Sequence, residues 1–252
     1  VSTPRVDENF EVARGLIAEA AAAGAELVAL PEYFCLMGQH DSDKLDIAEP
    51  LADVLIPGTH STPMQHVLSE SAREHGIWLI GGTLPIRAPD SDKVFNTTLV
   101  YGPDGARVAR YDKIHLFCFD DGQRRYDEAA TLRPGSAPVA FDLTDRSGQT
   151  WRVGLSVYYD LRFPELFRQL GAQQPLDLIV LAAAFTDTTG RAHWELLLRA
   201  RAVENLCHVL ASAQGGLHEN GRRTFGHSLA VGPWGEVLAC RREDGRGVVL
   251  AE

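Results

Sequence analysis

The stretch that decides the fold of this chain is VGLSVYYDLRFPEL, residues 153–166. Residues 153–157 are mostly apolar, which predicts a buried strand, and a polar turn follows them directly. Pro164 suits the first position of a helix, so a helix is expected after the turn. A strand that ends in a sharp turn before a helix commonly presents a nucleophile at its carboxyl end. The side chain at that point of the turn is Tyr158.

The rest of the chain alternates helical and strand-like segments, which favours an α/β fold. The 252 residues are 45% hydrophobic, enough to bury a large core in one domain. Helices are expected near 9–23, 64–75 and 191–205 and after Pro164, and strands near 27–30, 77–80, 96–101, 107–111, 176–182, 208–213, 228–231, 237–239 and 247–250.

Three further features concern loops and turns. The polar segment of about 34–57 is long, and loops of that length often line or cover a functional site. Gly81 and Gly82 are expected to let two backbones approach closely. Asn96 and Thr97 are expected to be turn residues.

Composition excludes several classes of function. A formal net charge of −10 argues against a nucleic-acid partner, because neutralising phosphates needs a basic face. No run of about 18 apolar residues occurs, so no membrane span is expected. The four cysteines have no metal-ligand spacing, so we expect neither a metal nor another cofactor. They suit a reduced, cytoplasmic protein with free thiols.

Charged residues stand where buried strands are expected to end. Glu32 directly follows strand 27–30, so its carboxyl can have a raised pKa and act as a general base. The alternative is a solvated loop glutamate. Lys113 ends a hairpin strand, where an ammonium can stabilise an oxyanion; the alternative is a surface lysine. Glu128 alone is an ordinary loop acid, and His115 is expected to be a structural hydrogen-bonding residue.

Taken together, separate segments of the chain resemble the nitrilase superfamily of carbon–nitrogen hydrolases over nearly its whole length. They are LPEYF (30–34), YDKIHLF (111–117), YDEAATLRPG (126–135), residues 153–166, FTDTTGRAHWE (185–195), LRARAVEN (198–205), GHS (226–228) and GPWG (232–235). The resemblance implies a four-layer α-β-β-α sandwich in which two mostly mixed sheets pack face to face between outer helices. It also implies one carbon–nitrogen hydrolase domain over 1–252, without the family's usual first strand and C-terminal tail.

The resemblance assigns a role to each candidate residue. Tyr158 stands where the family has its catalytic cysteine, and Glu32 takes the place of the general base. Lys113 and the backbone N–H of Tyr159 correspond to the oxyanion donors. Glu128 matches the family's second glutamate, which holds the lysine.

The resemblance is closest to amidases that act on small linear amides, such as ω-amides of dicarboxylic acids and deaminated glutathione. Segment 214–223 (QGGLHENGRR) leans toward the deaminated-glutathione type. Arg162 is a candidate for holding a substrate carboxylate, since arginine pairs with carboxylates through two bonds. Its alternative is a structural ion pair with Glu165 or Asp160. Phe185 opens the segment that matches the family's substrate-side loop.

Tyrosine at position 158 puts the reaction itself in question. A phenol has a pKa of about 10 against about 8.5 for a thiol, so it is harder to activate. Its oxygen also lies further from the backbone, and the ring is expected to fill space that a substrate needs. We therefore expect very weak amide hydrolysis or none. Cys118 follows Lys113 by five residues, but nothing in that spacing makes it a substitute nucleophile.

Two other functions remain open from the sequence. One is a catalytically silent protein that keeps the pocket, binds a small carboxylate or amide, and acts as a scaffold. The other is a carbamoylase or an acyl-transferring relative. By resemblance a homodimer is expected, with 164–170 and 191–205 as contact surfaces. Four polar or aromatic residues are expected to serve the scaffold: His193, Trp194, Glu204 and His227.

Overall fold

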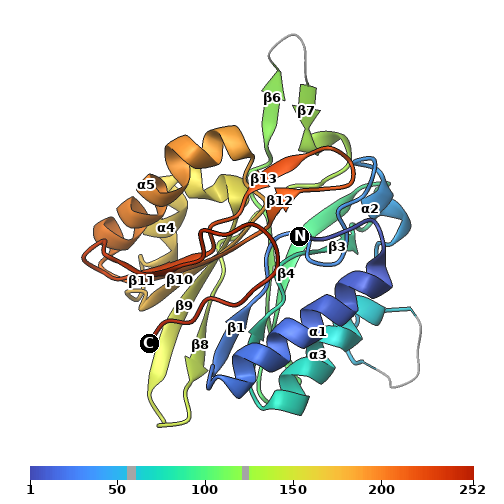
Figure 1. Cartoon of the computed structure of the whole chain (residues 1–252). Helices are drawn as coiled ribbons and strands as arrows, with labels where there is room; N and C mark the ends of the chain where they lie inside the picture. The colour runs from blue at the N-terminus through green and yellow to red at the C-terminus, as the bar shows by residue number, and fades with distance from the viewer. Residues whose placement is uncertain (56–60, 121–124) are drawn as a thin grey trace.

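The computed structural model of the chain describes residues 1–55, 61–120 and 125–252 (Figure 1). Its helices are α1 (Val6–Ala22), α2 (Asp43–Asp46), α3 (Pro63–His75), α4 (Pro164–Leu170) and α5 (Asp187–Asn205), with 3-10 turns η1 (Glu128–Ala130) and η2 (Tyr158–Arg162). Its strands are β1 (Leu27–Ala29), β2 (Trp78–Ile80), β3 (Leu84–Arg87), β4 (Val94–Tyr101), β5 (Arg107–Asp112), β6 (Cys118–Asp120), β7 (Arg125–Asp127), β8 (Ala140–Thr144), β9 (Thr150–Val157), β10 (Leu178–Ala183), β11 (His208–Ala213), β12 (Gly215–Leu217), β13 (Arg223–Phe225), β14 (Leu229–Val231) and β15 (Val237–Cys240).

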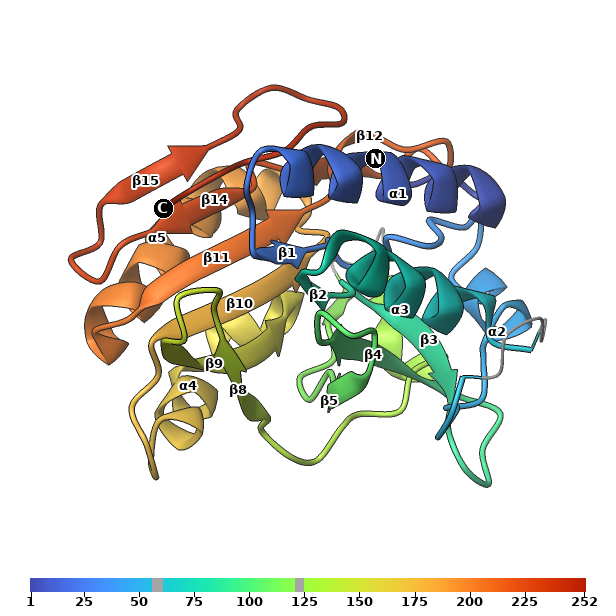
Figure 2. The same cartoon turned by 90° about the horizontal axis from the view of Figure 1, so that it is seen from below.

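Two mixed sheets form the centre of the fold. The first has the order β1-β2-β4-β3, with β5 paired to β4, and only β1 and β2 run parallel. The second has the order β15-β14-β11-β10-β9-β8, with β9, β10 and β11 parallel. Figures 1 and 2 show α1 and α3 outside the first sheet and α4 and α5 outside the second. This is the four-layer α-β-β-α sandwich that the resemblance implied.

Apolar packing holds the four layers together. One core cluster joins residues of both sheets, including Val100 of β4 and Leu155 of β9, and extends to Leu198 of α5. A second cluster packs α1 and α3 against the first sheet, with Ile17 and Leu68 fully buried. Burying a large aliphatic side chain contributes about 1.5–3 kcal/mol. The active-site candidates therefore stand on a scaffold whose sheets pack against each other and against the outer helices.

Most elements expected from the sequence are confirmed, with bounds shifted by a few residues. The strand expected at 247–250 is wrong: those residues pair with no strand in the described part of the chain. Val248 instead packs against the second core cluster, so its apolar character serves packing rather than pairing. The expected turn at Asn96 and Thr97 is also wrong, because both lie inside β4 with buried side chains.

The long polar loop is only partly irregular. It contains the short helix α2, and Glu49 forms an isolated bridge with Ile86 of β3. The Glu49 carboxylate accepts hydrogen bonds from the first-turn amides of α3, at Met64 and Gln65, which satisfies donors that a helix leaves open. The last two residues of the expected loop, 56 and 57, lie outside the described residues.

Close backbone approach at Gly82 is confirmed. Gly82 has φ +54°, and a Cβ there would lie 2.1 Å from the carbonyl oxygen of Pro31. Pro31 immediately precedes Glu32, so this contact fixes the exit of the chain from β1. Gly76, the C-cap of α3, has a similar φ of +59°, but a Cβ there would meet nothing within 4 Å.

Substituting each of these two glycines distinguishes the cost of backbone strain from the cost of a steric clash. Gly76→Ala is expected to lower the free energy of unfolding by about 1 kcal/mol, the cost of a left-handed alanine. Gly82→Ala adds a clash with backbone and is expected to cost about 3 kcal/mol in total. Urea unfolding of both variants measures the difference. Equal losses would contradict the tight contact with Pro31.

Candidate active site

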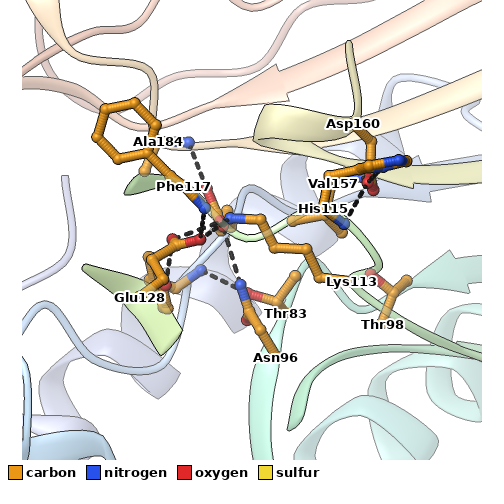
Figure 3. Close-up of polar contacts among 12 residues, drawn as sticks. Thr83, Asn96, Thr98, Lys113, His115, Phe117, Glu128, Val157, Asp160 and Ala184 are labelled. Atoms are coloured by element: carbon orange, nitrogen blue, oxygen red, sulfur yellow. Dashed lines mark hydrogen bonds and ion pairs between the residues drawn. The ribbon is translucent and has the colours of Figure 1, made fainter. Parts of the chain in front are cut away.

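The site forms where strands of both sheets end. Glu32 follows β1, Lys113 follows β5, Tyr158 follows β9 and Ala184 follows β10. Figure 3 shows the Lys113 side chain reaching toward Glu128, with Asn96 and the backbone of Ala184 close by. Residues that are far apart in the sequence therefore meet at one point between the sheets.

Glu32 is buried, and both of its carboxylate oxygens have hydrogen-bond partners. Oε1 accepts from the Asn96 side chain at 2.9 Å and from Lys113 Nζ at 3.1 Å. Oε2 accepts from the backbone N–H of Ala184 at 2.9 Å. Burial raises the pKa of the Glu32 carboxyl above its ordinary value, while the Lys113 ammonium opposes this rise. A carboxyl in this state is suited to accept and return a proton near neutral pH.

Lys113 lies fully buried between two carboxylates. Its Nζ is 3.1 Å from Glu32 Oε1 and 2.9 and 2.8 Å from the two oxygens of Glu128. Burial alone would lower the pKa of Lys113, but Glu128 and Glu32 outweigh it and raise the pKa above its ordinary value. The side chain therefore stays an ammonium, and its Nζ lies 4.8 Å from the centroid of the Tyr158 ring.

Glu128 is held in place by backbone and side-chain donors. Its Oε2 accepts from the backbone N–H of Phe117 at 2.7 Å, and its Oε1 accepts from the Tyr33 hydroxyl at 3.3 Å. Tyr33 has φ +57° and is held by a bond from its own N–H to the Thr83 hydroxyl. Glu128 thus joins Lys113 to the segments that follow β1 and β5.

Tyr158 occupies a strained position at the end of β9. Its φ is +41°, which is uncommon for a residue other than glycine. Buried Asp160 fixes the turn: it accepts hydrogen bonds from the Val157 N–H at 2.9 Å and the Tyr111 hydroxyl at 2.7 Å. It also accepts from the N–H of His115 at 3.1 Å, and its contact with His115 Nδ1 is 2.7 Å. These bonds define a strand–turn–helix elbow that holds the side chain at 158 toward the cluster.

Aromatic rings enclose the Tyr158 side chain, which is only 3% exposed. The rings of Phe117 and Phe185 meet it edge-on, with centroids 5.6 and 4.9 Å away. Burial raises the pKa of Tyr158 to about 12, against the opposing charges of Arg222 and Lys113. The phenol is therefore neutral at pH 7.

The other predicted residues lie around this elbow. Tyr159 directly follows Tyr158 in η2, and its ring stacks edge-on with Phe117 at 5.3 Å. Arg162 lies over the rings of Phe185 and Tyr159, at 5.5 and 6.0 Å. Among the described residues it forms neither of the two ion pairs considered as its alternative; its Nη2 lies 3.3 Å from His193 Nδ1.

The residues expected to serve the scaffold make hydrogen bonds, ion pairs and ring contacts within it. Trp194 is buried and donates to the carbonyl of His227 at 2.8 Å, and Glu204 pairs with Arg201. His115 stacks on Phe163 with centroids 3.7 Å apart. Cys118 lies exposed in β6.

Several residues at the site were given no role there from the sequence. Asn96 bonds Glu32, Gln214 donates to the carbonyl oxygen of Glu32 at 3.2 Å, and Arg222 donates to that of Ala184 at 2.8 Å. Arg201 binds the carbonyl of Leu161 in η2. A polar residue inside or just after an apolar strand is the one signal that could have pointed to Asn96 and Gln214.

Two features are absent from the described ranges. No group of three His, Cys, Asp or Glu side chains there is arranged to hold a metal ion. No helix in these ranges has the length and apolar character needed to cross a bilayer.

A buried Glu–Lys–Glu cluster beside a strand–turn–helix elbow, at the ends of two stacked sheets, belongs to the class of hydrolytic enzymes with an α-β-β-α fold. The carbon–nitrogen hydrolase family matches residues 2–252, and the chain belongs to that family. It is 39% identical over 254 residues to a deaminated glutathione amidase of Synechocystis sp., covering 100% of this chain and 88% of that protein.

Two more relatives place the chain within the family. It is 40% identical over 239 residues to omega-amidase NIT2-B of Xenopus laevis, covering 94% of this chain and 80% of that protein. The crystal structure of Saccharomyces cerevisiae Nit3, a member of branch 10 of the nitrilase superfamily, superposes with a TM-score of 0.82. That structure is 30% identical and covers 97% of this chain and 83% of its own. The resemblance inferred from the sequence motifs is confirmed.

Removing the buried ammonium tests the electrostatics of the cluster. Lys113→Met is expected to lower the free energy of unfolding at pH 8 by about 3–5 kcal/mol, because two buried carboxylates lose their cation. Arg146→Met, at an exposed side chain in the turn between β8 and β9, serves as the control and is expected to change it by less than about 0.5 kcal/mol. Urea unfolding measures both.

The same variant has a defined pH dependence. Without the ammonium, the pKa of Glu32 rises further above its unfolded value, so the native state binds more protons than the unfolded state between those two values. Stability of Lys113→Met is then expected to recover as pH falls from 8 to 5. A deficit that stays constant over this range would contradict the arrangement.

Proposed function

We propose that the site of this chain is built for hydrolysis of small linear amides, such as ω-amides of dicarboxylic acids or deaminated glutathione. We further propose that Tyr158 leaves this sequence with very weak activity or none. The observation that carries the proposal is the placement of Lys113 between Glu32 and Glu128 beside the elbow residue. The relatives named amidases support the choice of substrate class.

With a cysteine at position 158, each side chain would have a defined task. Glu32 would take the thiol proton as the sulfur attacks the amide carbon. Lys113 and the N–H of Tyr159 would bind the oxyanion, where one such donor typically contributes about 3–4 kcal/mol. Glu32 would pass the proton to the departing amine and then activate a water that hydrolyses the thioester. Glu128 would keep Lys113 charged and in place.

Tyr158 blocks this series of reaction steps in two ways. Its phenol keeps its proton, since burial raises the pKa of Tyr158 to about 12. Its ring, packed between Phe117 and Phe185, fills space beside Lys113 that an amide carbonyl would need. The attacking oxygen would also stand several bonds further from the elbow than a sulfur atom, outside a near-attack distance of about 3–3.5 Å.

Restoring the cysteine is the direct test. Tyr158→Cys is expected to release ammonia from α-ketoglutaramate at least about 10³-fold faster than the unmodified chain, since losing a nucleophile can cost about 10⁶ in kcat. Tyr158→Ala, which removes the ring without supplying sulfur, is the matched control and is expected to stay inactive. Turnover by the unmodified chain comparable to that of Tyr158→Cys would refute the proposal.

A silent binding or scaffold protein is the second candidate. The burial of Tyr158 among aromatic rings favours it, because the site is closed at the position where chemistry would occur. Calorimetric titration with glutaramate distinguishes the two: binding without turnover even by Tyr158→Cys supports a binding protein. A carbamoylase would instead release carbon dioxide and ammonia from an N-carbamoyl amino acid.

We also propose a homodimer formed through α4 and α5, in a reducing compartment such as the cytoplasm where its four cysteines stay free. On α5, Leu196 and Val203 are 66% and 48% exposed, which suits a surface that a partner covers.

Light scattering at micromolar concentration is expected to give twice the chain mass of 27.6 kDa. Leu196→Glu is expected to shift the population toward monomer, because a charge would be buried in the contact. Val54→Glu places the same charge on a 76% exposed residue outside α4 and α5 and is expected to leave the dimer intact. A monomeric unmodified chain would rule out the proposed dimer.

A further inference from the structure

Asn96 is a buried amide inside β4 that the proposed mechanism does not use. Its side chain is 2% exposed, and its backbone lies opposite Pro85 of β3. Its carbonyl accepts the N–H of Lys113 at 3.0 Å, so this part of the strand is held on both sides. Side chains alternate along a strand, so Asn96 shares a face of β4 with Val100, which packs in the core cluster between the sheets. Burying an amide is costly unless it is hydrogen-bonded, and Asn96 Nδ2 donates to Glu32 Oε1 at 2.9 Å.

The two oxygens of the Glu32 carboxylate are unequally occupied. Oε1 accepts two hydrogen bonds, from Asn96 Nδ2 and from Lys113 Nζ. Oε2 accepts one, from the backbone N–H of Ala184. Each oxygen of a carboxylate has two lone pairs that can accept hydrogen bonds. Among the described residues, the partners of Oε1 therefore use both of its lone pairs, whereas Oε2 keeps one that can receive a proton.

The partners of the two oxygens come from different sheets. Asn96, a partner of Oε1, lies in β4 of the first sheet. Ala184, the partner of Oε2, follows β10 of the second sheet, which runs parallel to β9 and pairs Ala182 with Val157. Figure 3 shows the backbone of Ala184 and the side chain of Asn96 on opposite sides of the cluster. Tyr158 directly follows Val157, so the oxygen with the open lone pair is bound from the strand end next to the elbow.

Lys113 is shared between two carboxylates, whereas Asn96 is not. The Nζ of Lys113 is 3.1 Å from Glu32 but 2.9 and 2.8 Å from the two oxygens of Glu128, so Glu128 is its closer partner. Burial raises the pKa of Glu32, and a neutral donor to the charged carboxylate opposes that rise without adding charge to the cluster. The Asn96 amide is such a donor, and its bond goes to Glu32 and not to Glu128.

We propose that Asn96 is a positioning residue for this hydrolysis: it holds Oε1 of Glu32, so that Oε2 alone exchanges protons during the reaction. The inference rests on the proposed function and concerns the same site. With a cysteine at position 158, the thiol proton moves to Oε2 as sulfur attacks, and Oε2 gives it to the amine nitrogen as the C–N bond breaks. A water then loses a proton to Oε2 as it attacks the thioester, and Oε2 returns that proton to the departing sulfur. Asn96 keeps both amide hydrogens throughout and acts only through Glu32.

The first test follows Glu32 in the full-length chain with Tyr158 in place and needs no turnover. Infrared spectra report the protonation of its carboxyl as pH changes, and Glu32→Gln identifies the band. Asn96→Leu is expected to move the titration of Glu32 to higher pH, because the charged form loses a donor. Ser69→Ala, which removes a buried bond from α3 to the carbonyl of Gly105, is the matched control and is expected to leave the titration unchanged. A titration that Asn96→Leu does not move would overturn the inference.

The second test measures turnover of α-ketoglutaramate by Tyr158→Cys. Adding Asn96→Leu is expected to lower kcat about 10²-fold and to change KM by less than about 3-fold, because a displaced base slows proton transfer without loosening the substrate. The acid limb of the pH profile of kcat/KM is expected to move to higher pH, as the titration of Glu32 does. Adding Ser69→Ala is expected to change neither. A raised KM with kcat unchanged would overturn the inference, since that pattern belongs to a residue that binds substrate.

Failure of the inference and failure of the proposed function give different results. An inactive Tyr158→Cys would refute the proposed function, and the titration of Glu32 would still decide whether Asn96 holds the carboxylate. An active Tyr158→Cys whose kcat and titration are both unchanged by Asn96→Leu would overturn the inference and leave the proposed function standing. Thermal unfolding confirms that each variant is folded. If Asn96→Leu is not, Asn96→Ala, which needs no extra space, takes its place with the same expected shifts.

Discussion

The structure depends on one ammonium ion buried between two carboxylates. Moving a charged group out of water costs several kcal/mol, and only close partners with hydrogen bonds offset that cost. Lys113 meets both requirements because Glu32 and Glu128 lie within 3.1 Å of it. Each carboxylate is in turn bound by a backbone N–H, from Ala184 and from Phe117. The cluster can form only where these segments converge, so it ties the site to the stacking of the two sheets.

The elements that the sequence predicted are those whose signals are local. Gly76 ends α3 in the left-handed conformation and Pro164 begins α4, positions at which glycine and proline are each enriched. The segment at 247–250 misled because four apolar residues in a row look alike whether they pair in a sheet or pack on a core. Periodicity reports which side chains are buried, and it does not report which backbone partners they find.

Site residues were predictable only where a family motif marked them. Glu32, Lys113 and Glu128 come from three separate motifs, and the structure brings them together. Asn96 was expected only as a turn residue and Arg222 only as part of segment 214–223, so neither was given a role at the site. Their importance comes from what they touch: Asn96 binds Glu32 and Arg222 binds Ala184. Those contacts exist only after the sheets have packed.

The backbone conformation of the elbow does not depend on the side chain at position 158. Its backbone keeps φ at +41° through Asp160, which binds the Val157 N–H, and through Arg201, which binds the Leu161 carbonyl. None of these bonds involves the side chain at 158, so the turn can present tyrosine or cysteine equally well. A left-handed residue costs about 1–2 kcal/mol, and the fold supplies that cost whatever the side chain is.

Burial at this elbow would hinder a thiol as well as a phenol. Burial raises the pKa of Cys207 to about 12 elsewhere in this fold, and the same effect raises the pKa of Tyr158 to a similar value. Cysteine therefore gains its advantage less from a lower starting pKa than from its reach, because the positive charges of Lys113 and Arg222 favour a thiolate and a phenolate alike. The scaffold provides the positive electrostatic field of Lys113 and Arg222 and a fixed distance between the backbone at position 158 and the substrate. Tyrosine shares the field, but its ring places the oxygen where the distance is wrong.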